Sequence, residues 1–407
     1  MKILIVNIYY GLFGGAEIIA NNTFDILKKE GHDVYFWSCN KQPFINDKYD
    51  YIKYFTKYNG GIKNYLKNPL KYYYNVNAKK DLAKFIALIK PDIIHIHNVQ
   101  NLSSSIYEAC RDIATVRTIH DASIICPKGT MINRINQICQ NKCKNGNYKQ
   151  CLFNICTGNI ESSCRYTIKS YFDTRLYKYI DKFITPSNAL RNALIASNIG
   201  IKETNSVTIN NFLNNEELKT TPSYTNQGYF LYIGRLSKEK SVITLLQAMQ
   251  DLPKEIKLHI VGTGPEEDNL KKYAKENGLH NIKFLGFKTG EDIKHEYQNC
   301  ISTILPCNGF EIFGMTNIES FINGKPVIAS NIGGIPEIVE DNVNGLLFEP
   351  ANVEQLRECI LKYWNNPELV IEHGKNGYKK VLTHYTEDIY YEKLIQLYEE
   401  TINEYKK

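Results

Sequence analysis

The sequence predicts an α/β protein made of two doubly wound domains with parallel sheets, and three observations lead to this fold class. Short apolar runs of strand length alternate with helix-length amphipathic stretches along most of the 407 residues. The alternation occurs in two series, one in each half of the chain. A polar stretch that contains Pro and Gly, residues 214–228, separates the two series and marks a domain boundary.

The first series predicts the first domain, residues 1–212. It begins with a strand at Lys2–Asn7, a glycine turn and an amphipathic helix at Ala16–Lys29, which Gly31 ends. The later apolar runs of strand length are His32–Ser38, Asp92–His97, Val116–His120, Lys182–Thr185 and Val207–Ile209.

The second series predicts the second domain, residues 213–386. Its expected strands are Tyr229–Ile233, Lys257–Val261, Lys283–Leu285, Ile301–Leu305 and Pro326–Ala329. Its expected helices are Val242–Gln250, Glu266–Asn277, Asp292–Tyr297, Met315–Phe321 and Val353–Trp364. Ligands of open α/β sheets bind beyond the carboxyl ends of the strands, so two such domains facing each other would enclose a ligand cleft.

The composition is that of a globular protein, with 43% hydrophobic and 23% charged residues. No apolar run reaches the roughly 20 residues of a membrane-spanning helix, and the N-terminal run is too short for a secretory signal, so we expect a cytoplasmic protein. Residues 1–212 hold 28 Lys and Arg against 15 Asp and Glu, whereas residues 213–407 hold 21 against 28. The basic half suggests an anionic partner.

The turn after the first strand, Gly11-Leu-Phe-Gly-Gly-Ala-Glu17, precedes a helix, and its glycines would let the backbone approach an anionic ligand. Its spacing is not that of the dinucleotide fingerprint, and no acidic residue ends the following strand, so a nicotinamide cofactor is not indicated. A tight turn that binds nothing is the alternative.

The segment Pro306–Ser320 carries two carboxylates eight positions apart, Glu311 in a glycine-containing loop and Glu319 in the next helix. Carboxylates accept hydrogen bonds from paired hydroxyls, so sugar and ribose are natural partners. Backbone N–H groups around Phe313 to Met315 would open that helix and suit a phosphate. The alternative is a surface helix with two ordinary acids.

Cations follow the first strand of the same domain. Gly234–Lys240 places Arg235 and Lys240 just beyond the carboxyl end of that strand. A diphosphate leaving group needs such cations, which favours a ligand site over a plain surface helix.

These motifs together resemble the retaining, nucleotide-sugar-dependent glycosyltransferases of family 4, which have the GT-B fold. The resemblance covers nearly the whole chain. The motifs that carry it are Gly14–Glu17, Asp92–His97, Thr118–Asp121, Pro186-Ser187, Asn210–Phe212, Gly234–Leu236, the Glu311 and Glu319 pair, and Gly324–Ser330.

The resemblance implies roles for individual residues. Arg235 and Lys240 would bind the donor pyrophosphate, Glu311 would contact the donor sugar, and Glu319 would hold the ribose hydroxyls. His120 would lie beside the reacting sugar and complete the catalytic set. The full donor-binding set would be Gly14, Gly15, Arg235, Lys240, Gly262, Glu311, Phe313, Gly314, Met315, Thr316 and Glu319.

Acceptor contacts are expected from the first domain, with His97 and Asp121 as candidates and a purely structural His97 as the alternative. One residue departs from the family pattern: Ser241 stands where the family often has glycine after the lysine. The resemblance also implies that a last helix, residues 387–407, returns to the first domain.

The implied reaction transfers a sugar with retention from a nucleoside diphosphate, UDP most commonly, to a glycan or lipid-linked glycan. Its setting would be cell-surface polysaccharide assembly, such as capsule or O-antigen. No metal cofactor is expected for catalysis, because cationic side chains would take the leaving charge and the chain has no Asp-x-Asp motif. The alternatives are a GT-B-like epimerase acting on a nucleotide sugar and a non-catalytic protein that only binds the donor.

Six of the eleven cysteines lie within residues 126–164, soon after His120. In a cytoplasmic protein such a cluster points first to metal or redox chemistry. Because this insert has little apolar periodicity, we expect it to need a staple, with structural zinc ahead of unlinked thiols and disulfides. The candidate ligands are Cys126, Cys139, Cys143, Cys151, Cys156 and Cys164.

Residues 51–80 contain seven lysines, eight aromatic residues and no acid. A basic and aromatic segment suits an anionic membrane surface, so we expect peripheral contact with the inner face of the cell membrane. A solvated loop and helix is the alternative. Nucleic acid is not an expected partner, because no recognised binding module accompanies the lysines.

Overall fold

The computed structural model describes residues 1–11, 14–39, 52–54, 69–99, 102–133, 139 and 143–406. The chain divides into two compact units. The first unit is Met1–Gly129, Gln140–Asn211 and Asp388–Lys407, and the second is Thr130–Cys139 and Phe212–Glu387.

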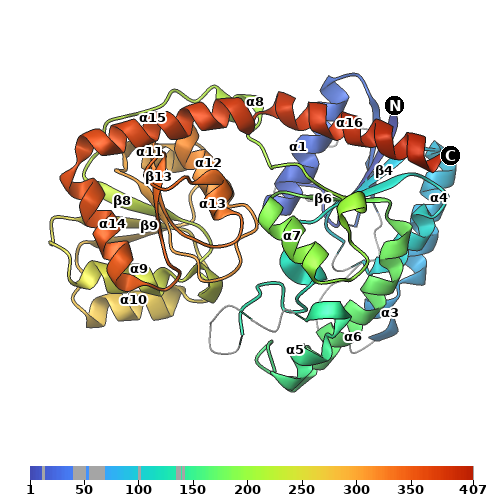
Figure 1. Cartoon of the computed structure of the whole chain (residues 1–407), viewed down its shortest axis with the longest axis horizontal. Coiled ribbons are helices and arrows are strands. Elements are labelled where there is room, and N and C mark those ends of the chain that lie inside the picture. The colour runs from blue at the N-terminus through green and yellow to red at the C-terminus, as the bar shows by residue number, and fades with distance from the viewer. Residues whose placement is uncertain are drawn as a thin grey trace. The chain divides into compact units, whose positions relative to one another are not determined.

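The first unit holds a parallel sheet (Figure 1). Its seven strands lie in the order β3-β2-β1-β4-β5-β6-β7. Its strands are β1 (Lys2–Val6), β2 (Asp33–Ser38), β3 (Ile52–Tyr54), β4 (Ile93–Ile96), β5 (Thr115–Thr118), β6 (Lys182–Thr185) and β7 (Ser206–Thr208). The strand order reverses between β1 and β4, which pair with each other. In open sheets this reversal leaves room for a ligand at the carboxyl edge.

Helices and 3-10 turns connect these strands. The α-helices are α1 (Gly15–Lys29), α3 (Pro69–Tyr73), α4 (Val76–Ile89), α5 (Lys149–Phe153), α6 (Ile160–Leu176) and α7 (Asn188–Ala196). The 3-10 helices are η1 (Ser104–Cys110), η2 (Ala122–Ile124), η3 (Lys144–Gly146), η4 (Tyr177–Tyr179) and η5 (Glu203–Asn205). β1 is buried from Ile3 to Val6, as the continuous apolar run of a strand covered on both faces requires.

The C-terminal helix α16 (Glu387–Tyr405) packs on the first unit (Figure 1), and tyrosine hydroxyls bond it there. Tyr390 bonds to Thr23 of α1 at 2.9 Å, and Tyr398 bonds to Nδ1 of His95 on β4 at 2.6 Å. The end of the chain therefore reaches the centre of the first sheet.

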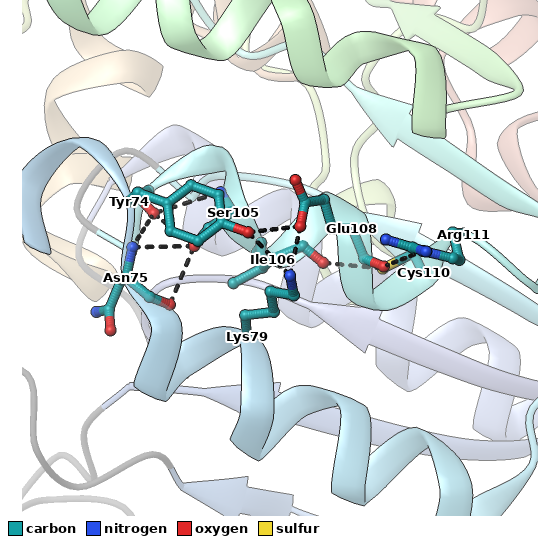
Figure 2. A network of polar contacts seen from close by, with 9 residues as sticks. Tyr74, Asn75, Lys79, Ser105, Ile106, Glu108, Cys110 and Arg111 are labelled. Atoms are coloured by element: carbon teal, nitrogen blue, oxygen red, sulfur yellow. Dashed lines mark hydrogen bonds and ion pairs between the residues drawn. The ribbon is translucent and has the colours of Figure 1, made fainter.

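A polar network fixes the start of α4 against η1 (Figure 2). The Asn75 side chain caps α4 by accepting from Ala78 N at 3.1 Å, while the Asn75 backbone N–H donates to the Ser105 hydroxyl. Lys79 and Tyr74 both contact the Glu108 carboxylate. Because Asn75 and Ser105 are buried, these bonds satisfy groups that would be costly to leave without partners.

The second unit holds a parallel sheet (Figure 1). Its six strands lie in the order β10-β9-β8-β11-β12-β13. Its strands are β8 (Tyr229–Ile233), β9 (Lys257–Val261), β10 (Ile282–Gly286), β11 (Thr303–Leu305), β12 (Val327–Ser330) and β13 (Gly345–Phe348). Its helices are α8 (Asn215–Leu218), η6 (Lys238–Lys240), α9 (Val242–Gln250), α10 (Glu267–Glu276), α11 (Gly290–Asn299), α12 (Met315–Ile322), α13 (Ile335–Ile338), α14 (Val353–Asn365) and α15 (Pro367–His384).

Alternating residues of these strands divide the core of the second unit into two layers. Phe230 and Tyr232 of β8 pack with α9, α10 and α14. Their neighbours on β8, Tyr229 and Leu231, face the opposite layer with Tyr297 of α11, and a further cluster there joins α12, α13 and α15. This is the period of two that a strand covered on both faces shows.

The predicted fold class of two doubly wound parallel-sheet domains is confirmed. The predicted strands Lys182–Thr185, Tyr229–Ile233 and Lys257–Val261 match β6, β8 and β9 residue for residue. Five elements of the second unit were not predicted: β13, α8, η6, α13 and α15. In the part of the chain that the structure describes, no helix is long and apolar enough to cross a membrane.

The cysteine-rich insert departs from expectation, because its described part has a small core of its own. Tyr148 is fully buried and packs with Cys143 and Cys151. The cysteines act here as small apolar side chains. A sequence pattern based on large apolar residues does not predict such a core. Residues Thr130–Cys139 of the insert group with the second unit.

Gly377 of α15 offers a test of packing in the second unit. A Cβ at Gly377 would lie 2.3 Å from the Phe321 ring of α12, so Gly377→Ala should destabilise the protein by about 1–3 kcal/mol through overpacking. Lys379→Ala, at an exposed position of the same helix, is the control and should change stability little. Denaturant unfolding measures both; equal midpoints for the two variants would contradict the packing described.

Candidate functional site

An ion pair between Lys240 and Glu311 joins two loops at the carboxyl edge of the second sheet. Lys240 follows β8, and Glu311 follows β11, which lies beside β8 in the sheet. The Cys307 thiol, buried at the end of β11, donates to the same Glu311 oxygen at 3.4 Å. The Lys240 ammonium and the Cys307 thiol therefore meet at one carboxylate, that of Glu311.

Burial alone would lower the pKa of the Lys240 ammonium, but nearby Cys307 and Glu311 outweigh it and raise that pKa above its usual range. Lys240 is therefore charged at neutral pH. Only 25% of its side chain is exposed, so a ligand would meet a partly desolvated cation, whose field is weakly screened.

Backbone contacts fix the Glu311 loop on both sides. The Glu239 carbonyl accepts from the N–H groups of Asn308 at 2.9 Å and Gly309 at 3.0 Å. On the other side, Gly334 N donates to the Glu311 carbonyl at 2.8 Å. A Cβ at Gly333 would lie 2.0 Å from that same carbonyl oxygen, so glycine is required for this approach.

A second close contact between a glycine and a backbone carbonyl brings together the loops after β8 and β9. Gly262 has φ of +130°, and a Cβ there would lie 2.0 Å from the Gly234 carbonyl oxygen. The Tyr232 hydroxyl donates to the Arg235 carbonyl at 2.9 Å, which holds the loop from below. The Arg235 side chain is exposed, so its guanidinium is available to an anion.

Gly314, the N-cap of helix α12, lies in the left-handed region, and no side chain caps the first turn of this helix. The backbone amides of Met315 and Thr316 therefore stand at an open helix start, which favours an anion. The Phe313 side chain is buried against Tyr385, so only its backbone is available to a ligand.

Glu319, about one turn into α12, has a different neighbour from Glu311. The Tyr297 hydroxyl of α11 donates to its carboxylate at 2.6 Å. Burial raises the pKa of Glu319, and the Tyr297 hydrogen bond opposes that shift. The Tyr297 hydroxyl thus orients the Glu319 carboxylate, whose negative charge burial destabilises.

In the first unit, Gly14 caps α1 in an extended conformation, and Gly15 is the first residue of the helix. The buried Glu17 carboxylate accepts from the Asn98 amide at 3.4 Å, and burial raises its pKa. A Cβ at Gly14 would lie 3.2 Å from a Glu17 carboxylate oxygen, a tight contact that a small shift of that side chain would relieve. Leu12 and Phe13 of the same turn lie outside the described residues.

Three histidines form a stack at the carboxyl ends of β4 and β5. The ring centroids of His95 and His97 are 4.1 Å apart, and those of His97 and His120 are 5.1 Å apart. Nδ1 of His97 and Nε2 of His120 are joined by a 2.9 Å hydrogen bond. Burial lowers the pKa of His95 and of His120 to about 3 and that of His97 well below its ordinary value, so all three are neutral at pH 7.

The two candidate acceptor residues differ in their surroundings. Asp121 caps η2 by accepting from Ser123 N at 2.8 Å. His97 is 1% exposed, and its Nδ1 is hydrogen-bonded to His120. The structure thus gives both residues local structural bonds beside His120.

All six clustered cysteines are thiols in the structure. Cys143, Cys151 and Cys156 pack together, while Cys139 belongs to the second unit. Within the described ranges no group of three or more Cys, His, Asp or Glu side chains is placed to hold a metal ion. The observed arrangement therefore lends the zinc expectation no support, and it stays a prediction for elemental analysis of the purified protein.

Several neighbours of the predicted site residues were not predicted. Glu311 accepts a hydrogen bond from Cys307, and Glu319 accepts one from Tyr297. Tyr398 bonds to His95 of the histidine stack. Cys307 lay inside the singled-out segment 306–320 and was the one with a detectable signal. Tyr398 is 303 positions from His95, a separation that no local pattern reveals.

Comparison with known proteins gives these loops a context. The family model described as "Glycosyltransferase Family 4" matches residues 13–217, and the model described as "Glycosyl transferases group 1" matches residues 214–380. The chain belongs to glycosyltransferase family 4. All the predicted site residues lie inside these two matches.

Related sequences and structures carry transferase names. The uncharacterized glycosyltransferase MJ1178 of Methanocaldococcus jannaschii is 26% identical over 93% of this chain and 92% of its own length. O-antigen chain mannosyltransferase C of Escherichia coli is 30% identical over 42% of this chain and 46% of its own. Sucrose-phosphate synthase of Thermosynechococcus elongatus superposes with a TM-score of 0.73 at 19% identity, covering 98% of each chain. The match to this structure shows that the family 4 glycosyltransferase has the GT-B fold, and none of these relatives supports the epimerase alternative.

Glu319 provides a test of whether burying its carboxylate lowers the stability of the folded protein. Folding raises the pKa of Glu319 above 4.5, so the folded protein binds the proton more tightly than the unfolded chain. The protein therefore loses stability as the pH rises from 4.5 to the pKa of Glu319 in the folded state. Glu319→Gln removes the buried charge and should raise the melting temperature at pH 7 while weakening donor binding. Melting curves at several pH values measure this; the gain should vanish below pH 4.5, and a destabilised variant at pH 7 would contradict the account.

Proposed function

We propose that this glycosyltransferase is a retaining enzyme that transfers a sugar from a UDP-sugar to a hydroxyl of a glycan or lipid-linked glycan. The observation that carries the proposal is the Lys240–Glu311 pair beside the open start of α12. A fixed cation, an exposed Arg235 and uncapped backbone amides together suit a diphosphate whose charge grows as it leaves.

The residues divide this work by their chemistry. Lys240 and Arg235 stabilise the leaving diphosphate, so catalysis needs no metal ion. Glu311, whose charge Lys240 compensates, accepts hydrogen bonds from donor-sugar hydroxyls, and Glu319 accepts from the ribose. Because His120 is neutral, it acts in this proposal as a hydrogen-bond partner of the reacting sugar.

Named relatives support the donor and acceptor classes. The Anabaena Alr3699/HepE structure, with a TM-score of 0.72 at 20% identity, is described in complex with UDP. A Staphylococcus aureus relative, 26% identical over 56% of this chain, is named poly(ribitol-phosphate) alpha-N-acetylglucosaminyltransferase. We therefore place this enzyme in the assembly of a cell-surface polymer.

The transfer reaction is tested with purified enzyme, a panel of nucleotide sugars and a glycan acceptor. UDP-sugars should raise the melting temperature by mass action, and Lys240→Met should lower kcat by about 100- to 1,000-fold, as loss of one oxyanion-type donor does. Lys238→Met is the matched control, because Lys238 lies exposed on the same 3-10 helix. Unchanged turnover in Lys240→Met, or an epimerised sugar formed from donor alone, would overturn the proposal.

A second proposal is peripheral contact with the inner face of the membrane, at a surface that α3, α5 and α6 form in the first unit. The sequence expectation rested on the basic and aromatic residues 51–80, of which 51 and 55–68 lie outside the described residues. Helix α6 supports the proposal independently, because its buried side carries hydroxyls, Ser163, Thr167 and Ser170. Thr167 donates to the Tyr148 carbonyl at 3.1 Å.

The outward side of this surface is apolar. Leu70 is 79% exposed, Phe153 74% and Ile160 65%, and Ile168 and Phe172 are also exposed. Lys169 and Asp173 pair with each other, which leaves a basic excess on the three helices. The remaining charged residues there are Lys71, Lys149, Arg165, Arg175 and Glu161.

This combination favours an anionic bilayer over a second copy of the chain. A two-fold interface would bring the basic surface against itself, whereas acyl chains and anionic headgroups complement both of its features. The enzyme should therefore pellet with anionic liposomes at low salt, and the double variant Phe153→Ser/Ile160→Ser should remain largely in the supernatant. Leu88→Ser, equally exposed on α4, is the control; equal recovery of the native enzyme with neutral liposomes would contradict the proposal.

A further inference from the structure

We propose that His97 is a positioning residue that fixes the tautomer of His120, so that His120 presents its Nδ1–H group to the ligand. The proposal rests on the proposed function only in taking His120 as a ligand contact. It replaces the direct acceptor contact that the sequence suggested for His97.

His95 provides a rigid platform for the stack. Its Nδ1 bonds to the Tyr398 hydroxyl of α16 at 2.6 Å, and its Nε2 bonds to the Thr118 hydroxyl of β5 at 2.7 Å. Both ring nitrogens are thus engaged in a fully buried side chain, so the ring cannot rotate without losing a bond. The His97 ring lies against it with centroids 4.1 Å apart.

His97 has one hydrogen-bond partner for its two ring nitrogens. Nδ1 meets Nε2 of His120 at 2.9 Å, whereas Nε2 is buried and no protein group among the described residues bonds to it. A neutral imidazole carries one proton, and burial keeps this ring neutral. The proton can therefore sit on Nδ1 or on Nε2.

The two placements differ in what they leave without a partner. A proton on Nε2 would create a buried N–H donor with no protein acceptor, which native structures rarely contain. A proton on Nδ1 leaves only a bare lone pair at Nε2, and an unmatched acceptor is the more tolerated of the two. His97 therefore donates from Nδ1, and His120 accepts at Nε2.

The proton of neutral His120 must then lie on Nδ1. Its remaining ring nitrogen becomes a hydrogen-bond donor suited to a hydroxyl or other oxygen of a sugar. With Nε2 occupied and Nδ1 already protonated, His120 has no lone pair with which to act as a general base. The stack thus assigns His120 an orienting and polarising role.

The tautomer can be read without any substrate. Two-bond proton–nitrogen NMR of the enzyme labelled with ¹⁵N-histidine, with His120 assigned by substitution, should show a protonated Nδ1 and an unprotonated Nε2. A protonated Nε2 in the native enzyme would overturn the proposal outright.

Substitutions separate positioning from packing. His97→Leu removes the donor that fixes the tautomer, so the Nδ1–H and Nε2–H forms of His120 should both be populated, and kcat should fall about 10-fold with KM little changed. His97→Asn, whose amide can donate from near the Nδ1 position, should restore the Nδ1–H form and most of kcat. His32→Leu, which alters a partly buried histidine bonded to Tyr391, is the control and should leave the His120 signals unchanged. An unchanged His120 tautomer in folded His97→Leu would refute the role of His97.

The outcomes distinguish this inference from the proposed function. The expected native tautomer together with no sugar transfer would refute the transferase reaction alone. Sugar transfer by an enzyme whose His120 carries the proton on Nε2 would refute the inference alone.

Discussion

The contact on which the second unit's site depends is the ion pair between Lys240 and Glu311. It joins a loop after β8 to a loop after β11, and these strands are neighbours in the sheet. Removing either partner would leave a partly buried charge uncompensated, which is costly in a protein interior. The pair therefore holds both loops in the arrangement that a diphosphate would meet, and it keeps Lys240 charged.

Backbone crowding makes this arrangement specific. Gly262 and Gly333 each approach a carbonyl of the neighbouring loop so closely that no side chain could be added. The cysteine-rich insert adds a further contact, because the Thr130 carbonyl accepts from Phe310 N at 3.3 Å and Ile132 lies against Gly309. The cysteine-rich insert, for which the sequence predicts a metal site, thus supports the loop that carries Glu311.

Strand positions were predictable because parallel strands covered on both faces are continuous apolar runs, as Tyr229–Ile233 illustrates. The second unit's residues Lys240 and Glu311 were predictable because they follow such strands and match a family pattern. The histidine stack was only half predictable: the spacing of His95 and His97 places them on one face, but their links to Tyr398 and His120 depend on the tertiary fold. Helix α6 was not predicted at all, because hydroxyl residues fill its buried face and the usual apolar periodicity is missing.

The central claim, that Lys240 and Glu311 act as one unit toward a diphosphate, is tested most directly by a double-mutant cycle on UDP binding. Calorimetry would compare the native enzyme, Lys240→Met, Glu311→Gln and the double variant. The account predicts that each single substitution weakens binding and that the double variant binds UDP no more weakly than Lys240→Met alone. Losses that simply add would contradict it, because they would show that the two side chains act independently.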